Sequence, residues 1–170
     1  ADSWVRSAAA GVRADTVDAP ITLPEDALRD HREAHPLASV FPLLDDVLGQ
    51  AARECDAIMA VSDAAGQLLW VCGTPGVLRR AESIGFVEGS NGDERLAGTN
   101  APGMALRLDR SVNVVGAEHF RRSVQRWASS WTLSGCAVAR LFVSLRSAAR
   151  SYSSQGSSLA ATSFQLPTRM

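Results

Sequence analysis

Two short apolar runs joined by a polar turn constrain the fold of this chain more than any other feature. Residues 58–61 and 68–72 are apolar throughout, and residues 62–67 between them read Ser-Asp-Ala-Ala-Gly-Gln. An aspartate that opens such a turn accepts hydrogen bonds from the backbone, and a glycine near its end adopts the left-handed conformation of many hairpin turns. The sequence therefore predicts two strands paired as an antiparallel hairpin.

Two helices are predicted before this hairpin. Pro24 followed by two acidic residues is typical of a helix start, and the helix should cover residues 25–34. A longer helix is predicted over residues 38–55, where apolar side chains recur every three or four positions and form one stripe. We interpret the stripe as core, with a dimer contact as the alternative. It comprises Val40, Leu44, Val47, Leu48, Ala51 and Cys55.

Helices and a further strand are predicted after the hairpin. A threonine cap followed by proline begins a helix over residues 75–83, and a glycine-bearing loop follows over residues 86–98. A short helix capped at residues 99–100 reaches residue 108, a strand covers residues 112–115, and a helix covers residues 118–127. This order indicates an α+β fold, an antiparallel sheet covered by helices.

Charge is divided unevenly along the chain. The net charge is −1 over 170 residues, but all 18 acidic residues lie at or before Glu118, whereas residues 119–170 carry seven arginines and no acid. A basic end of this kind is either a solvated arginine-rich tail or a patch that binds nucleic acid.

Length and composition exclude several classes of protein. A chain of 170 residues, 46% of them hydrophobic, suits one ordinary domain. Its apolar runs of about five residues fall short of the roughly 20 that a membrane helix needs. No charged-then-apolar segment opens the chain, so we expect a cytoplasmic protein without membrane contact. Cys55, Cys72 and Cys136 are far apart, which argues against a disulfide scaffold or a four-cysteine zinc site.

Several strings in the chain resemble one family. Three of them occur in the order found in one group of GAF domains. They are residues 58–71, the string Ala-Gly-Thr-Asn-Ala-Pro-Gly-Met-Ala-Leu at 97–106, and Gly-Ala-Glu-His-Phe at 116–120. These are the sensor domains at the N-terminus of actinobacterial transcriptional regulators, relatives of the acetoin-type activators. Residues 3–7 and 34–37 are similar to the lead-in segment of that group. The resemblance covers residues 3–127 and implies a GAF-like antiparallel sheet flanked by helices.

The resemblance does not extend to the end of the chain, and its limits divide the chain into three expected parts. After Trp127 the family's Ala-Pro-Ile-His-Asp-Pro-like turn and closing strand are missing. We hypothesise that residues from about 128 onward are read from a shifted frame, so that the division of charge marks a seam between a GAF-like body and a foreign C-terminus. Residues 137–145 still have the composition of a strand. The expected parts are an N-terminal helical extension (1–36), a GAF-like domain altered after about 127 (37–145), and a poorly ordered Ser/Ala/Arg-rich tail (146–170).

The resemblance implies that any ligand lies between the sheet and the helices and loops on one of its faces. A mostly apolar cleft with a few polar groups suits a small molecule. The alternative for Trp70, Phe86 and Met104 is plain core, and for Thr99 and Asn100 it is helix capping. The candidate wall comprises Trp70, Cys72, Phe86, Asn91, Asp93, Glu94, Thr99, Asn100, Met104 and His119.

Other reactive side chains have simpler interpretations. Glu118 and His119 could transfer a proton, but adjacent residues rarely face one another, and a structural histidine is preferred. His31 and His35 share a helix face without an evident third metal ligand, so no metal site is predicted. Cys72 is interpreted as a buried structural cysteine, with redox sensing as the alternative. The sequence has no phosphate-binding glycine loop or Ser/His/Asp motif, and it leaves the cofactor open.

These features favour a non-enzymatic sensory domain of a transcriptional regulator. It would bind an unknown small effector or a partner, form a homodimer through the helix over 38–55, and move the loop over 86–98. DNA would be contacted only through a downstream module, since no helix-turn-helix is found here. One alternative is a GAF-fold, thiol-dependent methionine sulfoxide reductase, which needs two or three cysteines to converge. Another is a truncated or frameshifted product without activity.

Overall fold

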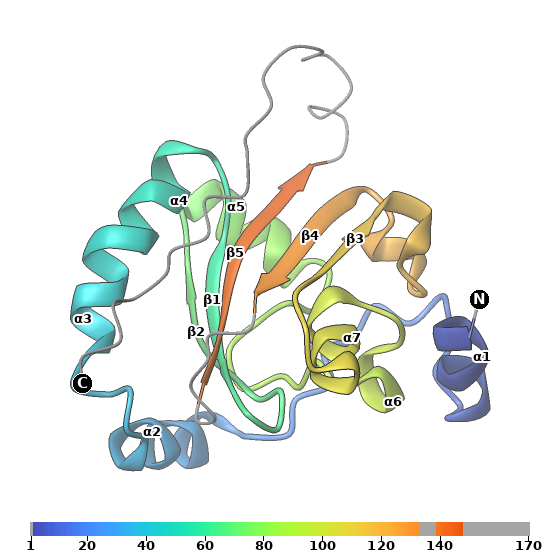
Figure 1. Cartoon of the computed structure of the whole chain (residues 1–170), viewed down its shortest axis with the longest axis horizontal. Coiled ribbons are helices and arrows are strands. Elements are labelled where there is room, and N and C mark those ends of the chain that lie inside the picture. The colour runs from blue at the N-terminus through green and yellow to red at the C-terminus, as the bar shows by residue number, and fades with distance from the viewer. Residues whose placement is uncertain (1, 133–138, 148–170) are drawn as a thin grey trace, which may run out of the picture.

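The computed structural model describes residues 2–132 and 139–147, and in this part of the chain an antiparallel sheet lies between two groups of helices (Figure 1). The five strands follow the order β2-β1-β5-β4-β3, and every neighbouring pair is antiparallel. The α+β prediction is therefore confirmed. The strands are β1 (Met59–Asp63), β2 (Leu68–Cys72), β3 (Val112–Val115), β4 (Trp127–Thr132) and β5 (Ala139–Ser147).

The helices are short and connect or flank these strands. Among the described residues, none is long and apolar enough to span a membrane. The α-helices are α1 (Asp2–Ala9), α2 (Glu25–Ala34), α3 (Phe41–Leu44), α4 (Gln50–Glu54), α5 (Pro75–Glu82), α6 (Glu94–Ala97) and α7 (Ala101–Leu108). A π-helical segment, η1 (Asp45–Gly49), joins α3 to α4, and two 3₁₀ turns, η2 (Gly116–Glu118) and η3 (Arg122–Val124), precede β4.

The predicted hairpin is present as β1 and β2. One oxygen of the Asp63 carboxylate accepts hydrogen bonds from the backbone N–H groups of Ala65 and Gln67, both at 2.9 Å. Gly66 adopts φ +84°, in the left-handed region that glycine enters without steric cost. The local turn chemistry expected from the sequence therefore closes the hairpin.

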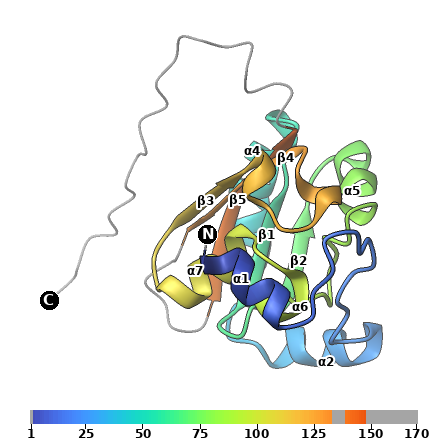
Figure 2. The same ribbon diagram turned by 90° about the vertical axis from the view of Figure 1, so that its right-hand side faces the viewer.

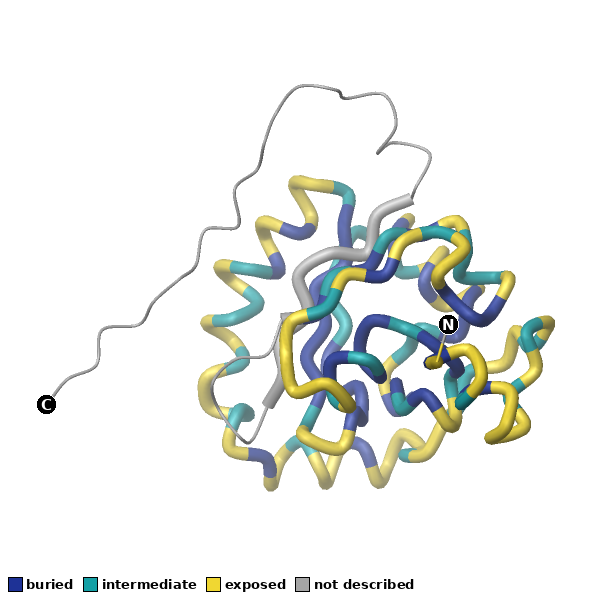
Figure 3. The backbone as a smooth tube through the Cα atoms, turned by 45° about the vertical axis from the view of Figure 1, so that its right-hand side comes forward, coloured by how far each residue is buried: buried dark blue, intermediate teal, exposed yellow. Residues whose placement is uncertain are grey.

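Ile58 and the residues of β1 that follow it alternate between two separate cores. Ile58 and Ala60 pack in a cluster with residues of α5 and α7, whereas Met59 and Val61 pack in a cluster with residues of α2 and α4. Figure 2 shows the helices arranged around the sheet, and Figure 3 shows the buried segments running through the centre of the molecule. The predictions of helices over 25–34, 75–83 and 99–108 agree with α2, α5 and α7.

The stripe predicted for residues 38–55 is only partly correct. Val40 and Val47 are 43% and 57% exposed, and Ala51 and Cys55 are exposed as well. The side facing the core carries Phe41, Leu48 and Ala52. The core-facing residues keep helical spacings of seven and four positions but are displaced by one position from Val40, Val47 and Ala51, and Phe41 stacks on Trp70 there.

The helix predicted over residues 118–127 is wrong. This segment begins at the last residue of η2, contains the 3₁₀ turn η3, and enters β4 at Trp127. Its backbone is bound to distant segments, since the N–H of Phe120 donates to the carbonyl of Thr99 at 3.1 Å and the N–H of Arg122 donates to that of Ala14 at 2.8 Å. These tertiary hydrogen bonds outweigh the local helical pattern. The loop predicted over 86–98 is also interrupted, by helix α6.

The C-terminal stretch supplies two strands of the sheet. Residues 139–145 of the predicted strand lie in β5, which pairs with β1 on one side and β4 on the other. Residues 133–138 and 148–170 lie outside the described residues, and so does most of the tail predicted over 146–170. The proposed change of reading frame and the three-part division of the chain remain predictions.

Gly89→Ala should destabilise the fold strongly. Gly89 adopts φ +80°, and a Cβ atom there would lie 2.4 Å from the carbonyl oxygen of Leu23. Left-handed strain and overpacking together should lower the free energy of unfolding by about 2–4 kcal/mol. In the matched control, Gly76→Ala, the new methyl group meets nothing within 4 Å at the start of α5, and stability should hold or rise slightly. Urea unfolding gives the free energy of unfolding of both variants. Equal losses of stability in Gly89→Ala and Gly76→Ala would contradict the prediction.

Candidate functional site

A cavity lies on the face of the sheet that α5 and α7 cover. Its walls are mostly apolar, it is partly open to solvent, and it holds about 60 Å³ of free space. Segments 84–92, 97–102 and 119–129 provide most of the lining, so chain segments far apart in sequence meet there. The lining residues are Pro20, Leu68, Ile84, Gly85, Phe86, Ser90, Asn91, Gly92, Ala97, Thr99, Asn100, Pro102, His119, Arg121, Val124 and Ser129.

Half of the predicted ligand-site residues line this cavity. They are Phe86, Asn91, Thr99, Asn100 and His119. Asp93 and Glu94 instead line a neighbouring open groove formed by residues of α1, α6 and α7, and Met104 packs against the core cluster on the same face of the sheet as the cavity. The structure thus brings together the loop residues and His119, and it places the two carboxylates outside the cavity.

Trp70 and Cys72 lie on the opposite face of the sheet from the cavity. Both pack in the cluster beneath α2 and α4, as the alternation along β2 predicts for residues two apart. Trp70 stacks on Phe41 with ring centroids 4.4 Å apart and planes at 13°, and it meets the edge of His35. Its position is that of a core aromatic, the alternative that the sequence left open for it.

Two asparagines hold the loop that closes the cavity. The side-chain amide of Asn100 donates to the carbonyls of Gly92 and Gly98, at 2.9 and 2.6 Å, and its oxygen accepts from the N–H of Gly103. Asn91 accepts from the N–H of Asp93 at 2.8 Å. Asn100 is therefore the N-cap of α7, as the capping interpretation expects, and it also holds the loop in place through its bonds to Gly92 and Gly98.

His119 is almost completely buried in the cavity wall, with 1% of its surface exposed. Its Nδ1 lies 3.0 Å from the carbonyl oxygen of Gly116, and its Nε2 lies 2.8 Å from Oγ of Ser129. Because a carbonyl only accepts, Nδ1 carries the hydrogen. Burial favours the neutral ring, whose Nε2 then accepts from the Ser129 hydroxyl, and that hydroxyl also lies 3.3 Å from the carbonyl oxygen of Val114. Burial lowers the pKa of His119, against a smaller opposing effect of its bond to Gly116. The structural interpretation of this histidine fits better than proton transfer with Glu118.

The cysteines do not converge in the described structure. Burial, followed by a hydrogen bond with Asp45, raises the pKa of the Cys72 thiol to about 12, which disfavours a reactive thiolate. Cys55 is exposed at the end of α4, and Cys136 lies outside the described residues. No group of three or more possible metal ligands occurs among the residues that the structure describes. His31 instead lies 3.1 Å from the Asp63 carboxylate.

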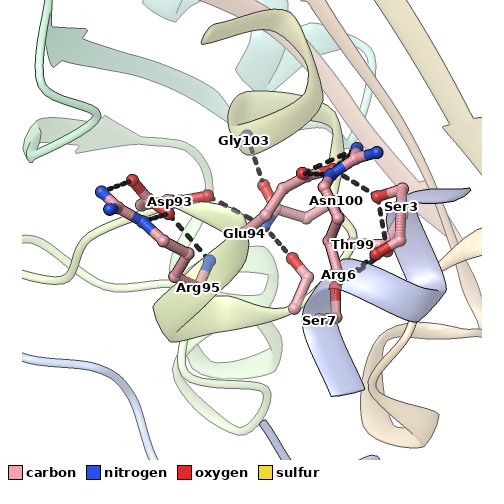
Figure 4. Close-up of polar contacts among 11 residues, drawn as sticks. Ser3, Arg6, Ser7, Asp93, Glu94, Arg95, Thr99, Asn100 and Gly103 are labelled. Atoms are coloured by element: carbon pink, nitrogen blue, oxygen red, sulfur yellow. Dashed lines mark hydrogen bonds and ion pairs between the residues drawn. The ribbon is translucent and has the colours of Figure 1, made fainter. Parts of the chain in front are cut away.

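Helix α1 docks beside the cavity through a buried polar network (Figure 4). The Glu94 carboxylate is 6% exposed and accepts hydrogen bonds of 2.9–3.2 Å from the Arg6 guanidinium, together with one from the Ser3 hydroxyl. Oγ1 of Thr99, a cavity residue, lies 2.7 Å from Oγ of Ser3 and 3.1 Å from Oγ of Ser7. The network therefore joins α1 to the cavity wall.

An aromatic contact strengthens the docking of α1 on the other side. The indole N–H of Trp4 donates to the carbonyl of Glu118 at 2.8 Å, and its ring meets Phe120 edge-on at 5.3 Å. The sequence analysis missed these roles. Ser3, Arg6 and Ser7 are three and four positions apart, which places them on one helix face, but that spacing does not identify Glu94 as their partner.

Comparison with known proteins shows sequence similarity to transcriptional regulators. No family model matches the chain. An uncharacterized 47.3 kDa protein in the thcA 5′ region of Rhodococcus erythropolis is 43% identical over 129 residues, which are 76% of this chain and 30% of that protein. The acetoin dehydrogenase operon transcriptional activator AcoR of Bacillus subtilis is 32% identical over 132 residues, 76% of this chain and 22% of AcoR. The chain thus spans less than a third of either relative.

A shorter sequence match and a solved structure complete the comparison. A signal-transduction and transcriptional-control protein of Clostridium beijerinckii is 34% identical over 65 residues, 38% of this chain and 10% of that protein. A chain of the crystal structure of the E. coli DhaR(N)–DhaL complex superposes with a TM-score of 0.65 at 20% identity, covering 83% of this chain and 50% of that one. The superposition on the DhaR(N)–DhaL chain shows a shared fold.

Glu94→Gln should weaken the packing of α1 against the rest of the domain. The amide removes the charge that Arg6 and Ser3 bind, and charge-assisted hydrogen bonds of this kind contribute about 1.5–3 kcal/mol. We expect a loss of that size in urea unfolding and faster hydrogen exchange in α1. The control is Asp15→Asn, which breaks the exposed pair with Arg13 and should leave the unfolding midpoint unchanged. A Glu94→Gln variant with unchanged protection of α1 would contradict this role of the network.

Removing His119 should flatten the dependence of stability on pH. Because burial lowers its folded-state pKa below the ordinary 6.5, the unfolded state takes up the proton at higher pH. The stability that the neutral ring contributes is present above pH 6.5 and is lost as the pH falls through 6.5 towards the folded-state pKa. Unfolding free energies from about pH 7.5 to about pH 5 should therefore fall more for the wild type than for His119→Gln. Parallel curves would refute the prediction.

Proposed function

We propose that this chain is the sensory domain of a transcriptional regulator, in which a small effector occupies the cavity and a DNA-binding module elsewhere in a longer protein responds. The observation that carries the proposal is a cavity bounded by three chain segments, in a chain similar over 76% of its length to a transcriptional activator. The similarity to a signal-transduction and transcriptional-control protein supports the same role. The GAF resemblance of the sequence motifs and a cytoplasmic location are consistent with it.

Effector binding can signal only if it favours one conformation over another. Two cavity residues offer such a connection. Thr99 contacts Ser3 and Ser7 of α1, and His119 is followed by Phe120, which contacts Trp4. An occupant that shifts either segment would change how α1 docks. We propose α1, together with the loop over 86–98, as the element that transmits the signal.

We further propose that the domain works as a homodimer. Val40, Leu43 and Val47 lie on the run from α3 to α4 and are 43%, 65% and 57% exposed. This apolar face is turned away from the core, and a second copy of the chain would cover it. The non-enzymatic reading is supported by the raised thiol pKa of Cys72 and by its position across the sheet from the cavity.

Ligand-dependent stabilisation tests the sensory role. A ligand at a hundred times its Kd stabilises the folded state by about 2.7 kcal/mol, so a screen of small metabolites should find compounds that raise the Tm of the wild-type chain. Ala97→Leu fills the cavity and should abolish that shift, because Ala97 lines it. Ala51→Leu, at an exposed position across the sheet, should retain it. A hit that stabilises Ala97→Leu equally would show binding elsewhere and contradict the proposal.

A further inference from the structure

One buried cation lines the cavity without an acidic partner. Arg121 is 5% exposed, and its guanidinium donates to two backbone carbonyls, from Nε to Thr16 at 2.9 Å and from Nη2 to Val17 at 2.6 Å. A guanidinium has five N–H donors. Its other N–H groups have no hydrogen-bond partner among the residues that the structure describes, and Arg121 is part of the cavity lining.

The surroundings of Arg121 do not neutralise its charge. The described residues that line the cavity include no aspartate or glutamate. Asp18 is close enough to favour the charged form, but it is exposed and forms no ion pair with Arg121 in the described structure. His119 cannot compete for an anion, because both of its ring nitrogens already have partners. Burying a cation in this way is costly unless an anion compensates it.

The remaining walls and the volume restrict what that anion can be. Leu68, Ile84 and Val124 present apolar surface to the cavity. A single water-sized site needs about 10–15 Å³, so the free space of about 60 Å³ holds roughly four to six non-hydrogen atoms. An inorganic anion such as phosphate would leave the apolar wall unused and its remaining oxygens without donors.

We infer that the cavity binds a short-chain monocarboxylate, of a size from acetate to butyrate, with its carboxylate on the Arg121 guanidinium and its chain against Leu68, Ile84 and Val124. The planar fork of arginine matches the two oxygens of a carboxylate, which makes this pairing stronger than one with a neutral oxygen. This inference rests on the proposed sensory function and names the class of its effector.

The test is binding of propionate to the full chain, measured as the rise in Tm and by titration calorimetry at constant ionic strength. Propionate should raise the Tm, whereas its neutral isostere propionamide and inorganic phosphate should not. Arg121→Gln should weaken propionate binding at least about tenfold. Arg122→Gln is the matched control, because the neighbouring arginine is exposed and absent from the cavity lining, and it should bind as the wild type does.

A second variant covers the case in which Arg121→Gln does not fold. Ala97→Leu keeps the arginine and fills the space, and it should lose propionate binding while melting cooperatively. Propionamide binding as tightly as propionate, or full affinity in either Arg121→Gln or Ala97→Leu, would overturn the inference. A neutral metabolite that binds the wild type but not Ala97→Leu, with no carboxylate binding, would overturn it and leave the sensory function standing. If no compound binds, either by the rise in Tm or by titration calorimetry, that result would count against both the monocarboxylate inference and the proposed sensory function.

Discussion

Strand β1 is buried on both faces, and the arrangement of the other elements depends on this. Met59, Ala60 and Val61 are at most 1% exposed, and the strand has β2 on one side and β5 on the other. A strand covered on both faces needs a helical layer on each, and the run from α2 to α4 supplies one while α5 and α7 supply the other. The alternation of side chains along β1 then decides which residues belong to which core.

The cavity occurs where loops, rather than helices, complete one of these layers. Loops carry backbone polar groups that must be satisfied when they are buried. Here the side chains of Asn91 and Asn100 provide those hydrogen bonds, and the carbonyls of Gly116, Thr16 and Val17 bind His119 and Arg121 in turn. The loops can therefore enclose apolar walls and place a cation beside them. These are the two properties from which the proposed effector class is argued.

Helix α1 extends this polar arrangement beyond the sheet. A carboxylate as buried as Glu94 is stable only when its oxygens are bound, and α1 brings the Arg6 guanidinium and the Ser3 hydroxyl to it. Thr99 belongs both to this network and to the cavity lining. The N-terminal segment is thus joined to the wall of the candidate site by contacts that a change in that wall would alter, which is why we assign it a part in transmission.

The sequence by itself determined the elements whose signals are local. Each of these depends on a few neighbouring residues, and all are present in the structure. They are the hairpin turn at Asp63 and Gly66, the helix caps Thr74 and Asn100, and the strand over 112–115. Five candidate site residues also line one cavity. Only the tertiary structure decided that Trp70 faces away from that cavity, that residues 118–127 are not a helix, and that Arg121 is buried inside it. The physical reason is that these outcomes depend on partners distant in the chain, such as the carbonyls of Thr16 and Val17, which no local spacing identifies.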